Sequence, residues 1–389
     1  MKFIESITSY IIYLNYRLKD NSIDSIIWIV NLVPSRAGFS ILKDKISAPF
    51  WILHFSLLVY VYGAGSVMYQ LRVASSTRDF LKSYVNITLI ILIVNNSYWF
   101  IKERPLLRTV LNQVIRNDIL SMETELLQDK HEKLLSVIKK IILIFYGFNL
   151  FDAFFIYIPH RSDVNNDHYS MTSCVGLEPL TATPNRQICR LILGLQEVTI
   201  MTAVLNYQTL LLFLIAHTEA MYRLLSEEML NFNQYASTPE SNIFVKNRLP
   251  LLVSRHSLTL DIIKNLKALY SMPMGVNFGS NAVCICLFFY LPLREWITFS
   301  PVLIYCFLVF FLYCYLCQRL INASEVFENA VYSCGWEKFN LNEQKTIYVM
   351  LLQAQKPVTL LAADIIPVNI STFATTIQAM FKFVTVVKL

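Results

Sequence analysis

Three charged side chains lie inside otherwise apolar stretches of this sequence, namely Asp152, Glu197 and Lys382. A charge at the lipid-facing centre of a membrane helix costs about 2.5–3.5 kcal/mol, so each should face water, a ligand or a polar partner. Asp152 could give a small ligand one directional hydrogen-bond partner, or Asp152 and Glu197 could each hold a neighbouring helix. Lys382 is expected either to line an aqueous pore or to reach the outer lipid head groups.

The other reactive residue types form no recognisable catalytic or metal-binding set. The six histidines are scattered, and the sequence contains no H-E-x-x-H, nucleophile elbow or glycine-rich phosphate loop. Cys314 and Cys317 form a C-x-x-C in an apolar stretch, where the spacing only puts both thiols on one helix face. Cys174 and Cys189 share a predicted outer loop, where a disulfide is feasible but not required. We expect no enzyme, no metal and no cofactor.

Seven apolar stretches supply the elements that must position these residues. Crossing a bilayer takes about 20 residues of helix, and each stretch is long enough. With 55% hydrophobic residues, the chain has too few polar residues to cover a water-facing globule of its size. We predict an all-α polytopic membrane protein with seven transmembrane helices. These helices are Ile46–Leu71, Ser83–Ile101, Ile141–Pro159, Leu191–Ala216, Ala268–Leu293, Trp296–Gln318 and Ile365–Leu389.

The positive charges between these stretches predict the orientation of the chain. Lys and Arg number 24 on the N-terminal side of the predicted membrane and 8 on the opposite side. Cytoplasmic loops carry the excess of Lys and Arg, so we predict a cytoplasmic N-terminus and an extracellular C-terminus. This is the reverse of a G-protein-coupled receptor. The same charges suit anionic lipids, so membrane lipids are expected partners and nucleic acid is not.

The predicted spans divide the chain into four parts. Residues 1–45 form a cytoplasmic N-terminal segment, and residues 46–320 form a six-helix transmembrane bundle with cytoplasmic helical extensions. One such extension is expected to continue the fourth span over Ala216–Tyr235, where apolar residues recur at helical spacing. Residues 321–364 form a cytoplasmic anchor segment. Residues 365–389 form the seventh, pore-forming helix.

Motifs near the C-terminus carry a resemblance to a known family. Ala354-Gln355-Lys356-Pro357 ends an amphipathic helix predicted over Asn342–Lys356, and Phe373-Ala374 lies near the start of the last span. Together with Trp336 and the inverted topology, these motifs resemble the C-terminal signature of insect odorant receptors. The arrangement is similar over the whole chain, whereas the specific motifs lie in about residues 325–389. One departure is Phe381-Lys-Phe-Val-Thr-Val-Val, where the family usually has Tyr-Ser-Tyr-Phe-Thr-Leu-Leu.

The resemblance implies a function and partners. It implies an odorant-binding subunit of a ligand-gated, non-selective cation channel in the plasma membrane of a sensory neuron dendrite. The partners implied are co-receptor subunits, in a hetero-tetramer, and a small volatile organic ligand. The gap between the fourth and fifth spans is short for the co-receptor branch, so the chain resembles a tuning subunit. The alternative is a gustatory-type, homomeric ligand-gated cation channel.

The resemblance also indicates where the ligand and the pore should lie. The family pocket lies among the second, third, fourth and sixth spans near the outer surface, and the pore is lined by the last helix. The pore candidates are therefore Lys382, Val386 and Leu389, with Val386 matching the gate position. Each pocket candidate could equally serve in ordinary bundle packing. These pocket candidates are Tyr84, Ile87, Ile91, Phe148, Phe151, Asp152, Phe155, Gln196, Thr199 and Ile200.

Overall fold

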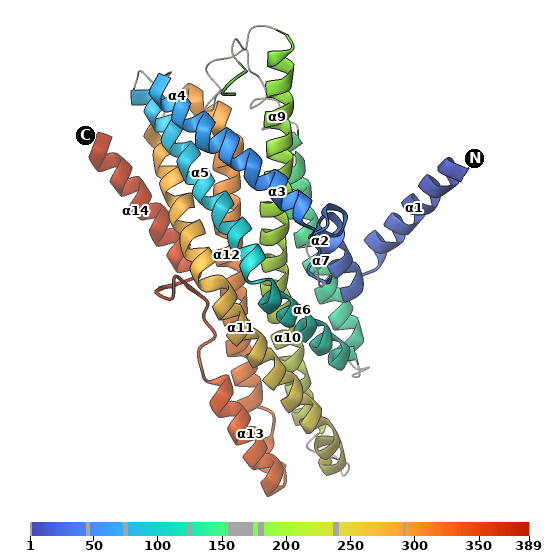
Figure 1. The fold of residues 1–389 in the computed structure, drawn as a ribbon. Coiled ribbons are helices and arrows are strands. Elements are labelled where there is room, and N and C mark those ends of the chain that lie inside the picture. Colours follow the sequence, from blue (N-terminus) through green and yellow to red (C-terminus); the bar gives the residue numbers. More distant parts are fainter. Residues whose placement is uncertain are drawn as a thin grey trace.

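The structure is a computed structural model in which the chain forms a bundle of long helices. Figure 1 shows α9 near one end of the bundle and α13 at the opposite end, with α1 and α14 projecting on different sides. Among the described residues, the only strands form a short antiparallel hairpin, β1–β2. The structure describes residues 2–43, 47–72, 77–122, 127–151, 153–154, 174–177, 183–235, 241–290 and 293–388.

The elements follow one another as helices with few interruptions. Two of them, η1 and η4, are π-helical segments that continue directly into α-helices, and η5 is a single 3-10 turn. In chain order the elements are α1 (Lys2–Lys19), α2 (Ile23–Ala37), α3 (Ala48–Leu57), η1 (Leu58–Gly65), α4 (Ser66–Arg72), α5 (Thr77–Lys102), α6 (Arg104–Met122), α7 (Gln128–Phe151), α9 (Asn185–Ile200), η4 (Met201–Leu205), α10 (Asn206–Tyr235), α11 (Ser241–Tyr290), α12 (Leu293–Tyr332), η5 (Trp336–Lys338), α13 (Leu341–Ala354), β1 (Leu361–Ala362), β2 (Ile366–Pro367) and α14 (Ile370–Lys388).

The helical membrane-type fold predicted from the sequence is confirmed. The part of the chain that the structure describes has six helical segments long and apolar enough to cross a membrane, and each overlaps one of the first six predicted spans with different bounds. The last predicted span, Ile365–Leu389, contains α14, but α14 begins at Ile370 because Ile366 and Pro367 pair with β1. The seventh crossing and the orientation of the termini stay predictions. The six segments are Ala48–Met68, Ser83–Lys102, Gln128–Phe151, Asn185–Phe232, Phe244–Tyr290 and Val302–Lys338.

Several helices are too long to end at the membrane surface. Helix α11 has 50 residues and α12 has 40, whereas about 20 residues cross the hydrocarbon. At about 1.5 Å per residue, each therefore extends well beyond one bilayer face. The predicted continuation of the fourth span over Ala216–Tyr235 is confirmed, because α10 runs without a break to Tyr235.

Helix α10 forms the centre of the bundle. Every residue in 203–222 is buried, so this part of the chain has no outward face. A helix that is apolar around its whole circumference is suited to such a position. Helices α12, α11, α7, α6 and α2 all pack against α10. The core of the protein is therefore arranged around one helix.

Polar side chains on α10 pair with side chains on α7 and α12. Asn206 Oδ1 accepts a hydrogen bond from Tyr146 on α7 at 2.7 Å. Gln208 Oε1 accepts one from Tyr305 on α12, also at 2.7 Å. Further along α10, Glu219 pairs with Arg319 on α12 at 3.0 Å. Such hydrogen bonds between membrane helices are worth roughly 0.6 kcal/mol on average, so together they fix the rotation of α10 more than they add stability.

A buried carboxylate joins α6, α7 and α10. Asp118 Oδ1 lies 2.7 Å from His131 Nε2 and 3.3 Å from His217 Nε2, and all three side chains are almost fully buried. Burial raises the pKa of a carboxyl group, but hydrogen bonds from His131 and His217 outweigh burial and lower the pKa of Asp118 to about 2. Asp118 is therefore a carboxylate that accepts hydrogen bonds from two other helices.

The β1–β2 hairpin rests on α11 immediately before the last helix. The Ala363 N–H donates to the Ser271 carbonyl oxygen at 2.7 Å. Ala363 and Asp364 have φ values of 52° and 58°, so they form a left-handed turn. Gly275 lies against this turn, because a Cβ added there would come within 2.7 Å of the Ala363 Cβ and 3.0 Å of its backbone nitrogen. Gly275 thus permits the close approach of the hairpin to α11.

Substitution of Gly275 should move the hairpin. We expect Gly275→Ala to lower stability by about 1–3 kcal/mol, the usual cost of overpacking, because the hairpin backbone leaves little room for relaxation. The measurement is the melting temperature of the purified protein in detergent. The matched control is Gly279→Ala on the same helix, where an added Cβ meets nothing within 4 Å. The control should be neutral or stabilising by up to about 1 kcal/mol, and an equal loss in both variants would contradict this account of the contact.

Candidate ligand-binding site

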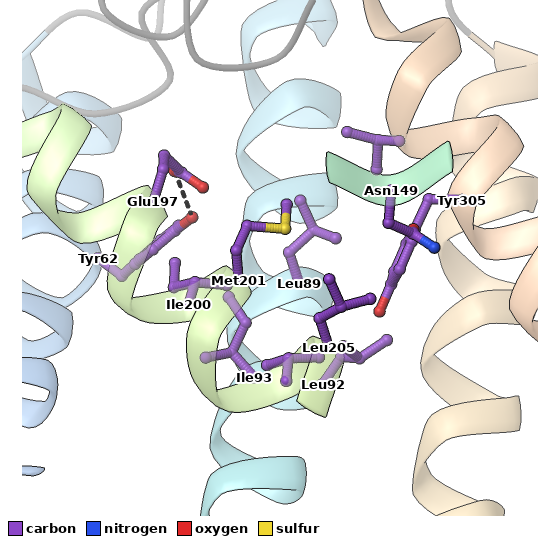
Figure 2. Close-up of a pocket in the computed structure, with 12 residues that line it drawn as sticks. Tyr62, Leu89, Leu92, Ile93, Asn149, Glu197, Ile200, Met201, Leu205 and Tyr305 are labelled. Atoms are coloured by element: carbon purple, nitrogen blue, oxygen red, sulfur yellow. Dashed lines mark hydrogen bonds between the residues drawn. The ribbon is translucent and has the colours of Figure 1, made fainter. Parts of the chain in front are cut away.

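A cavity opens between the helices near the end of the bundle that carries α9 (Figure 2). The cavity volume is about 70 Å³. A cavity that holds a single water needs only about 10–15 Å³ when volume is measured in the same way. The space therefore suits a small ligand, or a larger one once flexible side chains such as Met201 move. The lining residues are Tyr62, Leu89, Leu92, Ile93, Asn149, Glu197, Ile200, Met201, Val204, Leu205, Val302 and Tyr305.

Six elements bring these side chains together. Segment η1 contributes Tyr62, α5 contributes three aliphatic residues, and α7 contributes Asn149. Helix α9 and segment η4 form a continuous wall, and α12 closes the cavity with Val302 and Tyr305. Because the contributing elements are far apart in the sequence, the cavity exists only in the assembled bundle.

Two stretches of π-helix form part of this wall. Segment η1 carries Tyr62, and η4 carries Met201, Val204 and Leu205. A π-helical turn contains one extra residue, so it changes the rotation of the side chains that follow, and such turns are frequent at functional sites. Both π-helical segments are flanked by regular α-helix in the described chain. The distortions therefore coincide with the cavity.

The cavity has an apolar middle and two polar ends. Figure 2 shows Tyr62 and Glu197 at one end and Asn149 and Tyr305 at the other, with aliphatic side chains and Met201 between them. The Tyr62 hydroxyl donates to Glu197 Oε1 at 3.5 Å. Glu197 is only 1% exposed, so its carboxyl group is enclosed by protein and cavity. A mostly apolar pocket with a few placed polar groups is the usual form of a small-molecule site.

A buried polar contact lies beside the cavity and joins three helices. His54 on α3 has Nδ1 3.1 Å from Thr199 Oγ1 on α9 and Nε2 3.1 Å from Ser97 Oγ on α5. All three side chains are buried. Since α5 and α9 also supply cavity walls, this contact fixes the spacing between the walls. Thr199 therefore helps to set the spacing of the cavity walls without being part of the lining.

A disulfide bond links two segments of the chain near this end of the bundle. Cys174 and Cys189 are joined, with their Cα atoms 5.9 Å apart. Both cysteines pack in the same apolar cluster as Tyr62 and Ile200. The neighbouring Val175 carbonyl accepts a hydrogen bond from Tyr60 at 2.8 Å. The short described segment 174–177 is thus attached both to α9 and to η1, beside the cavity.

Most of the sequence-based pocket candidates lie outside the cavity lining. Ile200 lines the cavity, and Gln196 and Thr199 are buried next to it on α9 without being part of the lining. Asp152 and Phe155 fall outside the described residues. The other candidates lie on the outer faces of α5 and α7, where Tyr84 is 53% and Phe151 is 58% exposed. These outward candidates are Tyr84, Ile87, Ile91, Phe148 and Phe151.

On α5 and α7, the outward candidates and the lining residues lie on different faces of the same helix. Asn149 is buried at 3% exposure, while its neighbour Phe148 points away from the bundle. In a membrane, an apolar face can meet lipid as readily as it can meet protein, so an aromatic stripe does not identify the inner face. A polar residue at the same depth is the better signal, because it avoids lipid. Asn149 and Glu197 carry that signal in the sequence.

Two of the three pore candidates, Lys382 and Val386, lie on α14 and are not part of the cavity lining. Lys382 and Val386 are exposed in the single chain, with Val386 at 71%, and Leu389 lies outside the described residues. The bundle side of α14 is formed instead by Met380 and Val384, which are buried. Lys382 and Val386 thus share the side of α14 that faces away from the rest of this chain.

The long apolar helices and the enclosed cavity define a polytopic helical membrane protein with a site for a small molecule. A family model described as 7tm Odorant receptor matches residues 76–381, which is well over half of the chain. The chain belongs to this odorant receptor family.

Curated relatives are similar over part of their length. Odorant receptor 67a of Drosophila melanogaster is 25% identical over 177 residues, 43% of this chain and 42% of the relative. Odorant receptor 22a of the same species is 26% identical over 34% of this chain and 35% of its own. The odorant receptor coreceptor of Aedes aegypti is 21% identical over 40% and 34%. The chain thus matches less than half of the length of each of these relatives.

Solved structures extend the similarity in fold to almost the whole chain. The insect olfactory receptor OR5 from Machilis hrabei superposes with a TM-score of 0.73, at 16% identity, covering 95% of this chain and 99% of that one. The same receptor in complex with eugenol gives a TM-score of 0.72, at 14% identity, covering 93% and 97%. At these identities the match establishes the fold alone.

The cavity predicts which side chains control ligand potency. We expect Met201→Ala to raise the half-maximal concentration of a small agonist about tenfold, the equivalent of about 1.4 kcal/mol of lost contact. The measurement is a concentration–response series for agonists found in a panel of volatile compounds. Phe151→Ala, on the outward face, is the control and should leave potency within about twofold. Equal shifts in both variants would mean that the ligand binds elsewhere.

Proposed function

We propose that this protein is the odorant-binding, tuning subunit of a ligand-gated, non-selective cation channel, which works with co-receptor subunits in the plasma membrane of sensory neurons. Membership of the odorant receptor family supports the role in odorant recognition. The similarity to a co-receptor supports a partnership within that family. The observation that carries the channel part is the polar face of α14.

Helix α14 has a polar face that its own chain leaves uncovered. Ser371, Thr375, Gln378, Lys382 and Val386 follow at spacings of three or four residues, so they share one face. All five are exposed. Polar side chains at membrane depth require water or protein around them, because lipid satisfies none of their hydrogen bonds. Several copies of α14 around a central axis would enclose these side chains in an aqueous pore.

Oligomer formation is supported by α13, at the end of the bundle opposite α9. Helix α13 packs on α12 and α11 through its buried side, which includes Ile347 and Met350. Its other side exposes Tyr348 at 62%, Val349 at 57% and Leu352 at 45%. Adjacent exposed apolar residues of this kind mark protein contacts. We propose that the cytoplasmic helices of neighbouring subunits meet there and hold the α14 helices together.

Expression with and without an odorant co-receptor tests the proposed function. In cells that contain both proteins, we expect volatile ligands to evoke cation current that persists when G proteins are blocked. The chain alone should give none. Ligand-evoked current from the chain alone would favour the homomeric, gustatory-type alternative. Loss of the response under G-protein blockade would contradict the channel mechanism.

The face of α14 predicts an effect on ion selectivity. A positive charge beside the ion path repels a divalent cation about twice as strongly as a monovalent one. We therefore expect Lys382→Gln to raise calcium permeability relative to sodium, measured from reversal potentials at several calcium concentrations. Lys345→Gln, on the exposed side of α13, is a matched control that should leave the ratio unchanged. An unchanged ratio in Lys382→Gln would mean that Lys382 lies outside the ion path.

A further inference from the structure

We propose that three buried asparagines, Asn95, Asn96 and Asn277, couple the cavity to the β1–β2 hairpin, so that a bound ligand acts on α14 through α5 and α11. This inference rests on the proposed function, because it concerns how the same cavity acts on the helix proposed to line the pore. The three residues are called the asparagine cluster. They act as positioning residues, since none of them is part of the cavity lining in the described chain.

The asparagine cluster joins two long helices through side-chain amides. Asn95 Nδ2 on α5 donates to Asn277 Oδ1 on α11 at 2.9 Å, and Asn277 Nδ2 donates to Asn96 Oδ1 at 3.0 Å. All three side chains are buried. Asn277 thus uses both its acceptor and its donor on consecutive residues of α5. A shift or rotation of α5 against α11 therefore changes both hydrogen bonds at once.

On α5 the cluster directly follows the cavity wall. Leu89, Leu92 and Ile93 line the cavity, and Asn96 lies about one helical turn beyond Leu92. Asn96 Nδ2 also donates to the Leu92 carbonyl oxygen at 2.9 Å. The described lining takes walls from α5 and none from α11, so a ligand that moves α5 moves it relative to α11. Such a movement acts on the cluster.

On α11 the cluster lies where the hydrogen bonds of the helix itself are interrupted. Pro273 has no N–H to donate to the Leu269 carbonyl oxygen. The Pro273 carbonyl oxygen accepts a hydrogen bond from Asn95 Nδ2 at 3.1 Å. Two residues earlier, the Ser271 carbonyl oxygen accepts from the Ala363 N–H at 2.7 Å. Contacts from α5 and from the hairpin therefore hold the part of α11 where a proline makes bending easiest.

The hairpin that contacts Ser271 leads directly into α14. The Val368 N–H donates to the Leu360 carbonyl oxygen at 2.9 Å. Asn369 Oδ1 then accepts from the Thr372 N–H, in the first turn of α14, at 2.8 Å. Hydrogen bonds thus continue from the asparagine cluster through α11 and the hairpin to the start of α14. A ligand that favours one arrangement of α5 against α11 also favours the hairpin position that belongs to it.

The experiment separates ligand binding from its effect on α14. Receptors assembled from this chain and a co-receptor are prepared with and without Asn277→Leu, which keeps the branched side-chain shape and removes its polar atoms. The probe is the compound, from a panel of small alcohols, esters and phenols, that most raises the melting temperature of the wild type and does so less in Met201→Ala. The readouts are that rise, ligand-evoked current per receptor at the cell surface, and amide hydrogen exchange over residues 360–368.

Loss of the cluster should leave binding and remove its consequence. We expect the probe still to raise the melting temperature of Asn277→Leu. The change in hairpin exchange that the probe causes in the wild type should disappear, and current at saturating probe should fall about fivefold or more, the lower end of usual coupling factors. Asn265→Leu is the matched control on α11, because it breaks a 3.0 Å hydrogen bond to Gln113 on α6, and it should respond as the wild type does.

The outcomes separate this inference from the proposed function. If the probe evokes current and Asn277→Leu keeps both the current and the exchange response, the inference is wrong and the channel function stands. If the exchange response is present in the wild type and lost in Asn277→Leu while no receptor gives current, the inference stands and the channel function is wrong. Asn95→Leu, which removes the bonds to Asn277 and Pro273, decides in the same way if Asn277→Leu fails to reach the cell surface.

Discussion

The complete burial of α10 over residues 206–222 is the constraint on which the rest of the fold depends. A helix with no outward face must be surrounded, so its neighbours are arranged around it. In a bilayer, apolar contact alone would allow each neighbour to slide or rotate, since lipid is as apolar as leucine. The polar groups of α10 remove that freedom. Asn206, Gln208 and His217 each bond to a side chain on a different helix, namely α7, α12 and α6.

The cavity lies where this regular packing is interrupted. Next to η4, α10 is α-helical and buried on all sides over residues 206–222, whereas the cavity wall contains η4, which joins α9 to α10. On the facing side, η1 interrupts the helix formed by α3 and α4. Close-packed helices leave few voids larger than a water, so a cavity requires some departure from regular packing. Two π-helical segments that face one another supply that departure, and they place Tyr62 and Met201 at the cavity surface.

From the sequence, the helical stretches can be predicted more reliably than the helix faces that point inward. Long apolar runs and the positions of charges identify the first six spans, because length and hydropathy are properties of a stretch. Rotation depends on neighbours. Apart from Lys139, the buried positions on α7 form a stripe of period near 3.5 with polar residues at both ends, namely His131, Leu135, Ile138, Ile142, Phe145 and Asn149. The aromatic residues Phe148 and Phe151 form a second stripe that points outward, and hydrophobicity alone ranks it higher.

The π-helical segments explain why the remaining part of the cavity could not be predicted. An extra residue in a helix rotates everything after it by about 100° relative to an ideal 3.6-residue count. Helical spacing along α9 leads to Gln196, Thr199 and Ile200, of which only Ile200 lines the cavity, and it loses register at η4, where Met201, Val204 and Leu205 enter the lining. No residue in Met201–Leu205 is a glycine or proline that would announce the distortion.

Helix α12 connects the cavity with the helix proposed to line the pore. Tyr305 lines the cavity, and five positions later Phe310 packs on Phe373, with ring centroids 5.0 Å apart. Phe311 contacts the same ring at 5.6 Å. Phe373 lies in the first turns of α14, directly after the hairpin that rests on Gly275. Tyr305 at the cavity and the aromatic contact with Phe373 are thus carried by the same helix. The start of α14 is held by the hairpin and by Ile370 and Phe373, both of which pack on the core of the bundle, so the cavity and the helix proposed to line the pore share one continuous set of contacts.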